Sequence, residues 1–215
     1  MGKIKCVLFD CDGVLVDSET LGIGVLVSMV REYGYTLELE PAVDLMRGLS
    51  FKACCSLVEL AVGQTLPLDF EPRFRERSFE EFKLNMRPVP GVVPFVESLQ
   101  QPLGVASSGP VSKIRLNLGL VGLLPRFEGN IFSCFEIQSW KPEPDIYLHA
   151  AKSMGFAVDE CIVIEDSKPG VMAAVAGGFK TYGLAHPKTA CDLQDAGAEL
   201  FDGFDTLKLT LQPYL

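Results

Sequence analysis

Short apolar runs alternate with helical patterns along most of this chain. Runs rich in strand-forming residues lie at 4–9, 103–106, 131–134, 161–164 and 180–184. Helical patterns lie between or beside them, at 92–99, 111–118, 144–154 and 170–176. Strands that alternate with helices in this way are typical of a parallel, doubly wound sheet. The pattern therefore predicts an α/β fold.

The segment 18–87 has a different pattern, because its apolar residues recur at helical spacing and predict no strand. This spacing is seen at Leu21, Val25 and Met29, and again at Leu57, Leu60 and Ala61. Turn signals at 34–35, 40–41 and 66–67 are predicted to separate several helices. The turn-forming run 87–91 then marks the return to α/β alternation. We predict a core of residues 1–17 and 88–215, a small all-helical domain of residues 18–87, and hinges near Asp17 and Arg87.

Polar residues gather where the predicted strands end. Because the carboxyl ends of parallel strands meet at one edge of a sheet, and ligands bind there, these residues are expected to form one site. They are Asp10 and Asp12 after the first strand, Ser107 after the second, Lys141 in the loop after the third, and Glu165 and Asp166 after the fourth.

The carboxylates at 10 and 12 repel each other, so a cation is expected nearby. One interpretation is a solvated turn that caps the next helix. The other is a site for a hard cation, in which one carboxylate is a nucleophile and the second donates and accepts a proton. Magnesium prefers oxygen ligands, and Asp10 and Asp166, joined by a backbone carbonyl and waters, would suit it.

Ser107 and Lys141 could both bind an anion. The Ser107 hydroxyl and the backbone N–H groups beside it could hold phosphate oxygens, although a turn or N-cap role is equally open. Lys141 lies between Trp140 and Pro142, so its stem is expected to be constrained. A fixed ammonium near a metal–carboxylate cluster would neutralise phosphate charge, whereas an ordinary surface lysine would not.

Composition and net charge limit the kinds of molecule that this protein is expected to bind. The net charge is −9 and the pI is about 4.8, which argues against a broad nucleic-acid or anionic-membrane surface. The seven cysteines include no CxxC pair, so reduced thiols are expected, and the two histidines are too far apart for a structural zinc site. We find no signal peptide and no apolar stretch long enough to span a membrane, and expect a cytoplasmic location.

Four motifs in order resemble those of the haloacid dehalogenase superfamily across the whole chain. They are DCDGVLVDSE at 10–19, VASSG at 105–109, WKPEPDIY at 140–147 and VIEDSKPGVMAA at 163–174. The resemblance implies a Rossmann-like core, and the helical segment lies where the family's first type of cap domain lies. The predicted fold is therefore a doubly wound parallel-sheet core with a small all-helical cap.

The resemblance also implies roles for individual residues. Asp10 would be the nucleophile, and Asp12 would be the general acid for the leaving alcohol and then the base for water. Ser107 and Lys141 would hold the transferring phosphoryl group, with Ser108 and Gly109 beside it. Magnesium would be held by Asp10, the Asp12 carbonyl and Asp166, with Glu165 in or beside the shell.

The cap is expected to supply substrate specificity. The segment 46–50 (MRGLS) resembles the family's specificity loop, and Arg47 is a candidate for a second anionic group of the substrate. Glu19 is expected at the site entrance. A solvated helix charge is the alternative for Arg47.

Within the family the sequence favours a phosphatase of a small phosphorylated metabolite. Asp12 argues against a dehalogenase, and the absence of a histidine before His149 argues against a sugar phosphomutase. The block 132–155 resembles the 6-phosphogluconate phosphatase group, close to the β-phosphoglucomutase branch. A mutase of the same family and a catalytically silent binding module stay open. The oligomeric state is not determined, with a monomer favoured.

Overall fold

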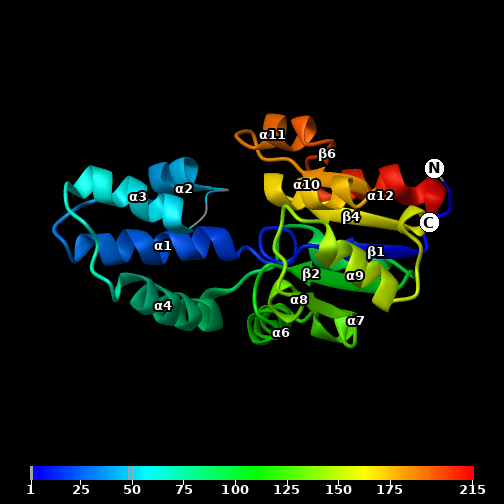
Figure 1. The fold of residues 1–215 in the computed structure, drawn as a ribbon, viewed down its shortest axis with the longest axis horizontal. Helices are drawn as coiled ribbons and strands as arrows, with labels where there is room; N and C mark the ends of the chain where they lie inside the picture. Colours follow the sequence, from blue (N-terminus) through cyan, green and yellow to red (C-terminus); the bar gives the residue numbers. More distant parts are fainter. Residues whose placement is uncertain (1, 48, 50) are drawn as a thin grey trace. The chain divides into compact units, whose positions relative to one another are not determined.

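The computed structural model describes residues 2–47, 49 and 51–215, in two compact units (Figure 1). The first unit comprises Met1–Asp17 and Arg87–Leu215, and the second comprises Ser18–Met86. Arg87 thus groups with the first unit, one residue from the predicted boundary. Within the first unit the backbone N–H of Asp17 donates to the Arg87 carbonyl at 2.9 Å, so the two connecting segments run beside each other there.

The described residues of the first unit form a six-stranded sheet in which every neighbouring pair is parallel. The strand order is β3-β2-β1-β4-β5-β6, so the chain winds outward from β1 to β3 and then from β4 to β6. The predicted doubly wound α/β fold is confirmed. The strands are β1 (Cys6–Phe9), β2 (Leu103–Ser107), β3 (Ile131–Ser133), β4 (Cys161–Glu165), β5 (Lys180–Leu184) and β6 (Glu199–Phe201).

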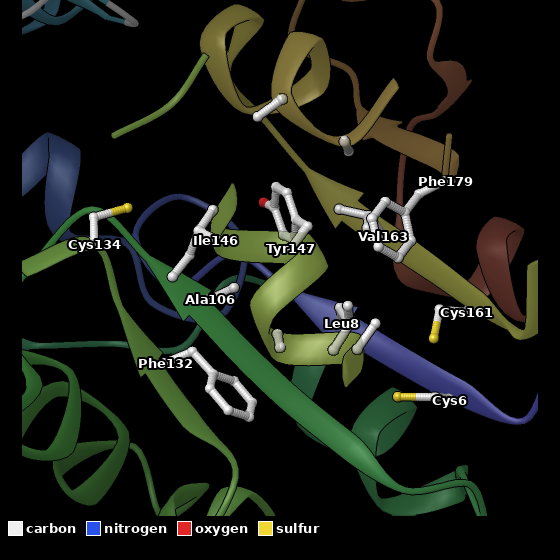
Figure 2. Close-up of a cluster of buried hydrophobic side chains, with 14 residues drawn as sticks. Cys6, Leu8, Ala106, Phe132, Cys134, Ile146, Tyr147, Cys161, Val163 and Phe179 are labelled. Atoms are coloured by element: carbon white, nitrogen blue, oxygen red, sulfur yellow. The ribbon is translucent and has the colours of Figure 1, made fainter. Parts of the chain in front are cut away.

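Successive side chains along each strand point to opposite faces of the sheet. Both faces carry buried apolar side chains, and helices cover both of them. Leu8 belongs to a buried cluster with Val163 and Tyr147 (Figure 2). Phe9, the next residue, packs against Phe95 and Phe127, with ring centroids 6.2 and 5.6 Å away. The helices of this unit are α5 (Val92–Ser98), α6 (Val111–Leu120), α7 (Leu124–Phe127), α8 (Cys134–Ile137), α9 (Asp145–Ser153), α10 (Lys168–Ala176), α11 (Ala190–Asp195) and α12 (Phe204–Leu211), with short 3-10 helices at Val158–Glu160 and Gln212–Tyr214.

Two parts of the first unit differ from the prediction. Cys134 begins α8 instead of ending β3, because the Ser133 side chain accepts a hydrogen bond from the Phe135 N–H and caps that helix. The elements α7, α11, β6 and α12 were not predicted. The strand β6 is only three residues long and begins with the exposed Glu199, so its apolar pattern is too short to detect.

Within its described residues the second unit is helical throughout. Its helices are α1 (Ser18–Arg31), α2 (Leu39–Met46), α3 (Phe51–Val62) and α4 (Phe70–Asn85), and they share one buried apolar cluster. Pro41 does not separate two helices as predicted. It lies in the first turn of α2, where a proline is tolerated because that N–H has no intrahelical partner.

The predicted apolar face of α3 is also wrong in part. Leu60 is 84% exposed, and the residues of α3 that are buried are Cys54 and Val58, four positions apart. Spacing alone could not distinguish these two faces, because both carry apolar residues. Each helix in the described part of the chain is too short or too polar to serve as a membrane span.

Candidate active site

The site lies where the strand order reverses, at the neighbouring ends of β1 and β4. Asp10 follows β1 directly, and its backbone N–H donates to the Ile164 carbonyl of β4 at 2.9 Å. Glu165 is the last residue of β4, and Asp166 follows it. Ligands bind at such a point in doubly wound sheets because the crossover helices leave in opposite directions there. The fold therefore brings the two predicted acidic motifs together.

Lys141 joins these motifs to β2. Its ammonium donates to Asp10 Oδ1 at 2.5 Å, to Glu165 Oε1 at 2.7 Å and to the Ala106 carbonyl at 3.1 Å. The side chain is only 5% exposed. An ammonium has three donors, and these contacts use all of them. The buried charge is thus held in one position, which sequence reasoning could propose but not establish.

Glu165 is buried completely, and both of its oxygens accept hydrogen bonds. Besides Lys141, Oε1 accepts from the Tyr147 hydroxyl at 2.8 Å. Oε2 accepts from the backbone N–H groups of Asp166 and Ser167 at 3.0 Å and from the Ser167 hydroxyl at 2.9 Å. This network fixes the carboxylate beside Lys141. Tyr147, inside the predicted WKPEPDIY motif, was not singled out from the sequence.

The electrostatics follow from this burial. The pKa of Asp10 is raised to about 7, because burial and the charges of Glu165 and Asp12 together outweigh the opposing effect of Lys141. Burial acts to lower the pKa of Lys141, but Asp10 and Glu165 outweigh it and raise that pKa well above its usual value. Burial acts to raise the pKa of Glu165, yet Lys141 and the hydrogen bonds hold it below its usual value. Lys141 and Glu165 are therefore a charged pair.

Asp10, Glu165 and Asp166 could hold a metal ion. Each offers a carboxylate oxygen, and the three oxygens lie within 4.8 Å of one another. The adjacent Gly13, at φ +85°, leaves room for this group, because a Cβ atom there would lie 1.9 Å from Asp166 Oδ2. Asp12 lies beside the Lys113 ammonium, and Asp10 and Glu165 lie beside the Lys141 ammonium. The all-oxygen donor set of Asp10, Glu165 and Asp166 fits a magnesium ion.

The loop after β2 lies beside Lys141. Ser107 is buried, and its Oγ accepts a hydrogen bond from the Gly109 N–H at 3.0 Å. The Gly109 carbonyl in turn accepts from the Ser133 hydroxyl at 2.7 Å. Ser108 is exposed, with its Oγ 3.9 Å from Cys134 Sγ. The loop is therefore held from β3, with hydroxyl and backbone donors on the same edge as the carboxylates.

Asp12 is held from α6, a helix that sequence reasoning did not connect with the site. The Lys113 ammonium donates to Asp12 Oδ2 at 2.8 Å, and the Asn117 amide donates to Oδ1 at 3.3 Å. The two residues are four apart on the helix that follows the VASSG motif. Four-residue spacing places polar side chains on one helix face, and this was the signal that could have found them.

The second unit contains its own polar cluster. Arg47 donates to Glu19 Oε2 and to the Thr20 hydroxyl, both at 3.3 Å. The side chains of Arg47 and Glu19 are 24% and 25% exposed. Two residues of the predicted specificity loop, Gly48 and Ser50, lie outside the described residues. The predicted anion-binding residue is thus paired with a carboxylate that the prediction treated separately.

Comparisons with known proteins agree with this architecture. The family model for haloacid dehalogenase-like hydrolases matches residues 4–178. The 6-phosphogluconate phosphatase of Escherichia coli (strain K12) is 32% identical over 183 residues, covering 85% of this chain and 83% of that protein. An HAD family hydrolase from Deinococcus radiodurans R1, solved with bound phosphate and sodium, has 27% identity and a TM-score of 0.86, covering 100% of this chain and 97% of that one.

A putative beta-phosphoglucomutase from Thermotoga maritima also shares the fold. It has 26% identity and a TM-score of 0.82, and the match covers 99% of this chain and 100% of that one. In a doubly wound sheet, an acidic, lysine-paired centre at the carboxyl edge lies where α/β enzymes bind their ligands. The chain belongs to the haloacid dehalogenase-like hydrolase family, in the enzyme class of phosphoric monoester hydrolases. The family predicted from the four motifs is confirmed.

Proposed function

We propose that this protein is a magnesium-dependent phosphatase that acts on a small sugar or sugar-acid phosphate through an aspartyl-phosphate on Asp10. The contact between the buried Lys141 ammonium and the Asp10 carboxylate carries the proposal. A carboxylate at the end of a strand, held by a fixed cation, is suited to attack phosphorus. The same cation would neutralise charge on the phosphoryl group that the carboxylate receives.

In the first step, a carboxylate oxygen of Asp10 forms a bond to phosphorus, and the bond to the leaving alcohol oxygen breaks. Asp12 donates its proton to that oxygen. The Ser107 hydroxyl and the N–H group at Ser108 would bind phosphoryl oxygens, since this loop lies on the same edge of the sheet as Asp10. Gly109, whose N–H donates to Ser107 Oγ, would lie beside the phosphoryl group and hold that hydroxyl in place. In-line transfer needs positioning and charge neutralisation, which these groups provide.

In the second step, water attacks the phosphorus and the Asp10–phosphorus bond breaks. Asp12 accepts the proton from water, so the enzyme returns to its starting state and inorganic phosphate leaves. Lys141 stays protonated throughout, because its raised pKa keeps the ammonium charged at neutral pH. Glu165 holds this ammonium in place and takes no part in proton transfer.

Magnesium would be held by Asp10 and Asp166, together with the Asp12 carbonyl. We place Glu165 beside this shell and not in it, because both of its oxygens already accept hydrogen bonds from five donors. When bound, the ion would neutralise carboxylate and phosphoryl charge. Its positive charge would also favour the ionised, nucleophilic form of Asp10 over the protonated form that burial favours.

Substrate choice is assigned to the helical unit, which we propose to be the cap domain. Arg47 would bind a second anionic group of the substrate, such as a carboxylate, in competition with Glu19. The 6-phosphogluconate phosphatase relative makes a phosphorylated sugar acid the first substrate to test. The seven cysteines, all in the described ranges, are free thiols, which supports a reducing compartment such as the cytoplasm.

A sugar phosphomutase is the second candidate, because the Thermotoga maritima structure named as a putative mutase shares the fold. It differs in outcome, since a mutase returns the phosphoryl group to the sugar. The chain has no histidine before His149, so it lacks the residue that the prediction linked to mutase activity. A catalytically silent module is disfavoured by the site itself, where buried charges are held in an arrangement that stability alone does not require.

The test is phosphate release from a panel of sugar phosphates and sugar-acid phosphates, with magnesium and with EDTA. Wild-type protein is expected to release phosphate only with magnesium, and Asp10→Asn is expected to release none. Isomer formation is measured in the same reactions. Isomer without free phosphate would replace the phosphatase proposal by the mutase, and no turnover of any panel member would overturn both.

A further inference from the structure

Both oxygens of the Asp12 carboxylate accept hydrogen bonds from side chains on one face of α6. Lys113 binds Oδ2 at 2.8 Å and Asn117 binds Oδ1 at 3.3 Å. Rotation of the Asp12 side chain would therefore break both contacts at once. Both hydrogen bonds come from α6, which lies far along the chain from Asp12. They fix the position of the Asp12 carboxylate relative to the loop after β2.

Asn117 is fully buried, and its Oδ1 has no hydrogen-bond partner within the part of the chain that the structure describes. Burying an amide oxygen without a partner is unfavourable for folding, and an apolar side chain of similar volume would avoid that cost. Packing therefore does not explain an asparagine at this position. The donation of its Nδ2 to Asp12 does.

The position of Lys113 also fits a role in holding the Asp12 carboxylate. Its side chain is 33% exposed, and a Cβ atom on Gly109 would lie 3.4 Å from Lys113 Cδ and 4.0 Å from Asp12 Oδ2. The lysine stem thus passes directly beside the Ser107–Gly109 loop before it reaches Asp12. Burial acts to lower the pKa of Lys113, but Asp12 outweighs it and raises that pKa, so the group is an ammonium.

We infer that Lys113 and Asn117 are positioning residues that hold Asp12 in the orientation needed for proton transfer at the phosphoryl group. The inference rests on the proposed function, in which Asp12 gives a proton to the leaving oxygen and later takes one from water. Lys113 and Asn117 themselves exchange no proton. They fix where the Asp12 oxygens lie beside the phosphate-binding loop.

The experiment compares two leaving groups. Protonation matters for an alkyl phosphate such as a sugar phosphate, whereas the acidic phenol of p-nitrophenyl phosphate leaves without a proton. The value of kcat/KM covers the steps up to formation of the aspartyl-phosphate. It therefore reports on protonation of the leaving oxygen and not on the later attack by water. Lys113→Met is expected to lower kcat/KM for the alkyl phosphate about 10- to 100-fold, and that for p-nitrophenyl phosphate less than about threefold.

Asn117→Leu separates positioning from folding, because it removes the donor while filling the volume and removing the unpartnered oxygen. It is expected to show the same leaving-group selectivity, with thermal stability maintained. Arg115→Met is the matched control, since Arg115 lies on the same helix and pairs with Glu128 at the surface. It is expected to change neither kcat/KM value.

Coupling to Asp12 gives the decisive outcome. In an Asp12→Asn background, Lys113→Met is expected to cause no further loss with the alkyl phosphate, because the group it positions is absent. Equal losses for both leaving groups, or an undiminished loss in the Asp12→Asn background, would overturn the inference while wild-type phosphatase activity still supports the proposed function. Wild type that releases phosphate from neither substrate would instead overturn the proposed function, and this inference with it.

Discussion

Gly13 and Asp166 are in such close contact that a single added carbon would separate them. A Cβ atom on Gly13 would lie 1.9 Å from Asp166 Oδ2 and 2.6 Å from its Cγ. The turn after β1 thus supports a carboxylate that follows β4, across the centre of the sheet. This relationship links a glycine of the first motif to the proposed metal ligand of the last.

Gly13→Ala is therefore expected to displace Asp166 and weaken magnesium binding. The concentration of magnesium that gives half-maximal activity should rise about 10- to 100-fold, as for other losses of support around a metal ligand. The measurement is the rate of phosphate release as a function of magnesium concentration. Thermal unfolding of the same variant measures its stability.

Gly129→Ala is the matched control. Gly129 has the same φ of +85° but no atom within 4 Å of its would-be Cβ. It should therefore show only the cost of a left-handed alanine, about 1–2 kcal/mol, with an unchanged magnesium requirement. Identical magnesium curves for the two variants would contradict the proposed link between Gly13 and the metal site.

A second prediction concerns Gly170 in the first turn of α10. A Cβ atom there would lie 1.7 Å from Glu165 Oε1, so Gly170→Ala must displace the partner of Lys141. We expect a loss of stability of about 1–3 kcal/mol, as for overpacking in a core, together with a fall in kcat. Denaturant unfolding and steady-state kinetics measure the two effects.

Gly119→Ala on α6 is the comparison, because its nearest contact would be Leu124 Cδ2 at an ordinary 4.0 Å. Alanine exceeds glycine in helix propensity, so this variant should gain about 0.5–1 kcal/mol. If Gly170→Ala gained stability to the same extent, the close contact with Glu165 would not exist in solution.

The third prediction removes the central cation. Lys141→Met would leave the carboxylates of Asp10 and Glu165 buried without their shared partner, at a cost of about 3–5 kcal/mol. Activity should fall at least about 100-fold, because the charge that faces the phosphoryl group is lost. Lys180→Met removes a half-exposed lysine paired with Glu199 at the sheet edge and is expected to change both quantities little.

The cost of Lys141→Met should also depend on pH. Without Lys141, the pKa values of Asp10 and Glu165 rise, because both lose the charge that favours their ionised forms. A carboxyl whose folded-state pKa is raised contributes stability at low pH that is lost as pH rises through that pKa. In EDTA the variant should therefore lose more stability, relative to wild type, at about pH 8 than at about pH 6. A difference that does not change with pH would contradict the buried carboxylate pair.

The fourth prediction tests the Arg47–Glu19 pair. Arg47→Met should raise KM for a sugar-acid phosphate about tenfold, within the range of a lost charge-assisted contact, and leave p-nitrophenyl phosphate unaffected. Glu19→Gln should lower KM for the same substrate, because it removes the competing carboxylate. Arg31→Met, at the exposed end of α1, is the control. An equal effect of Arg47→Met on both substrates would show that Arg47 supports the fold and not recognition of a second anion.

Much of the core fold was accessible from the sequence because its strands are buried on both faces. Such strands are continuous apolar runs that end at polar turns, so β1, β2 and β4 could be placed within one or two residues. The strand β6 and its flanking helices were missed, since a short edge strand has one exposed side and carries little pattern. Pro41 was misjudged because proline ends a helix in its interior but fits its first turn.

The candidate site also has some features that could be predicted from the sequence and others that only the tertiary structure shows. The sequence by itself determined which carboxylates follow the strands, and parallel topology then required Asp10 and Glu165 to meet at one edge. Only the tertiary structure decided that Glu165 is committed to Lys141 and Tyr147, that Gly13 and Gly170 make room for carboxylates, and that Lys113 and Asn117 reach Asp12. The physical reason is that residue type and strand position are local properties, whereas the side-chain hydrogen bonds of this site join residues as far apart in the chain as Asp10 and Lys141, which are separated by 131 positions.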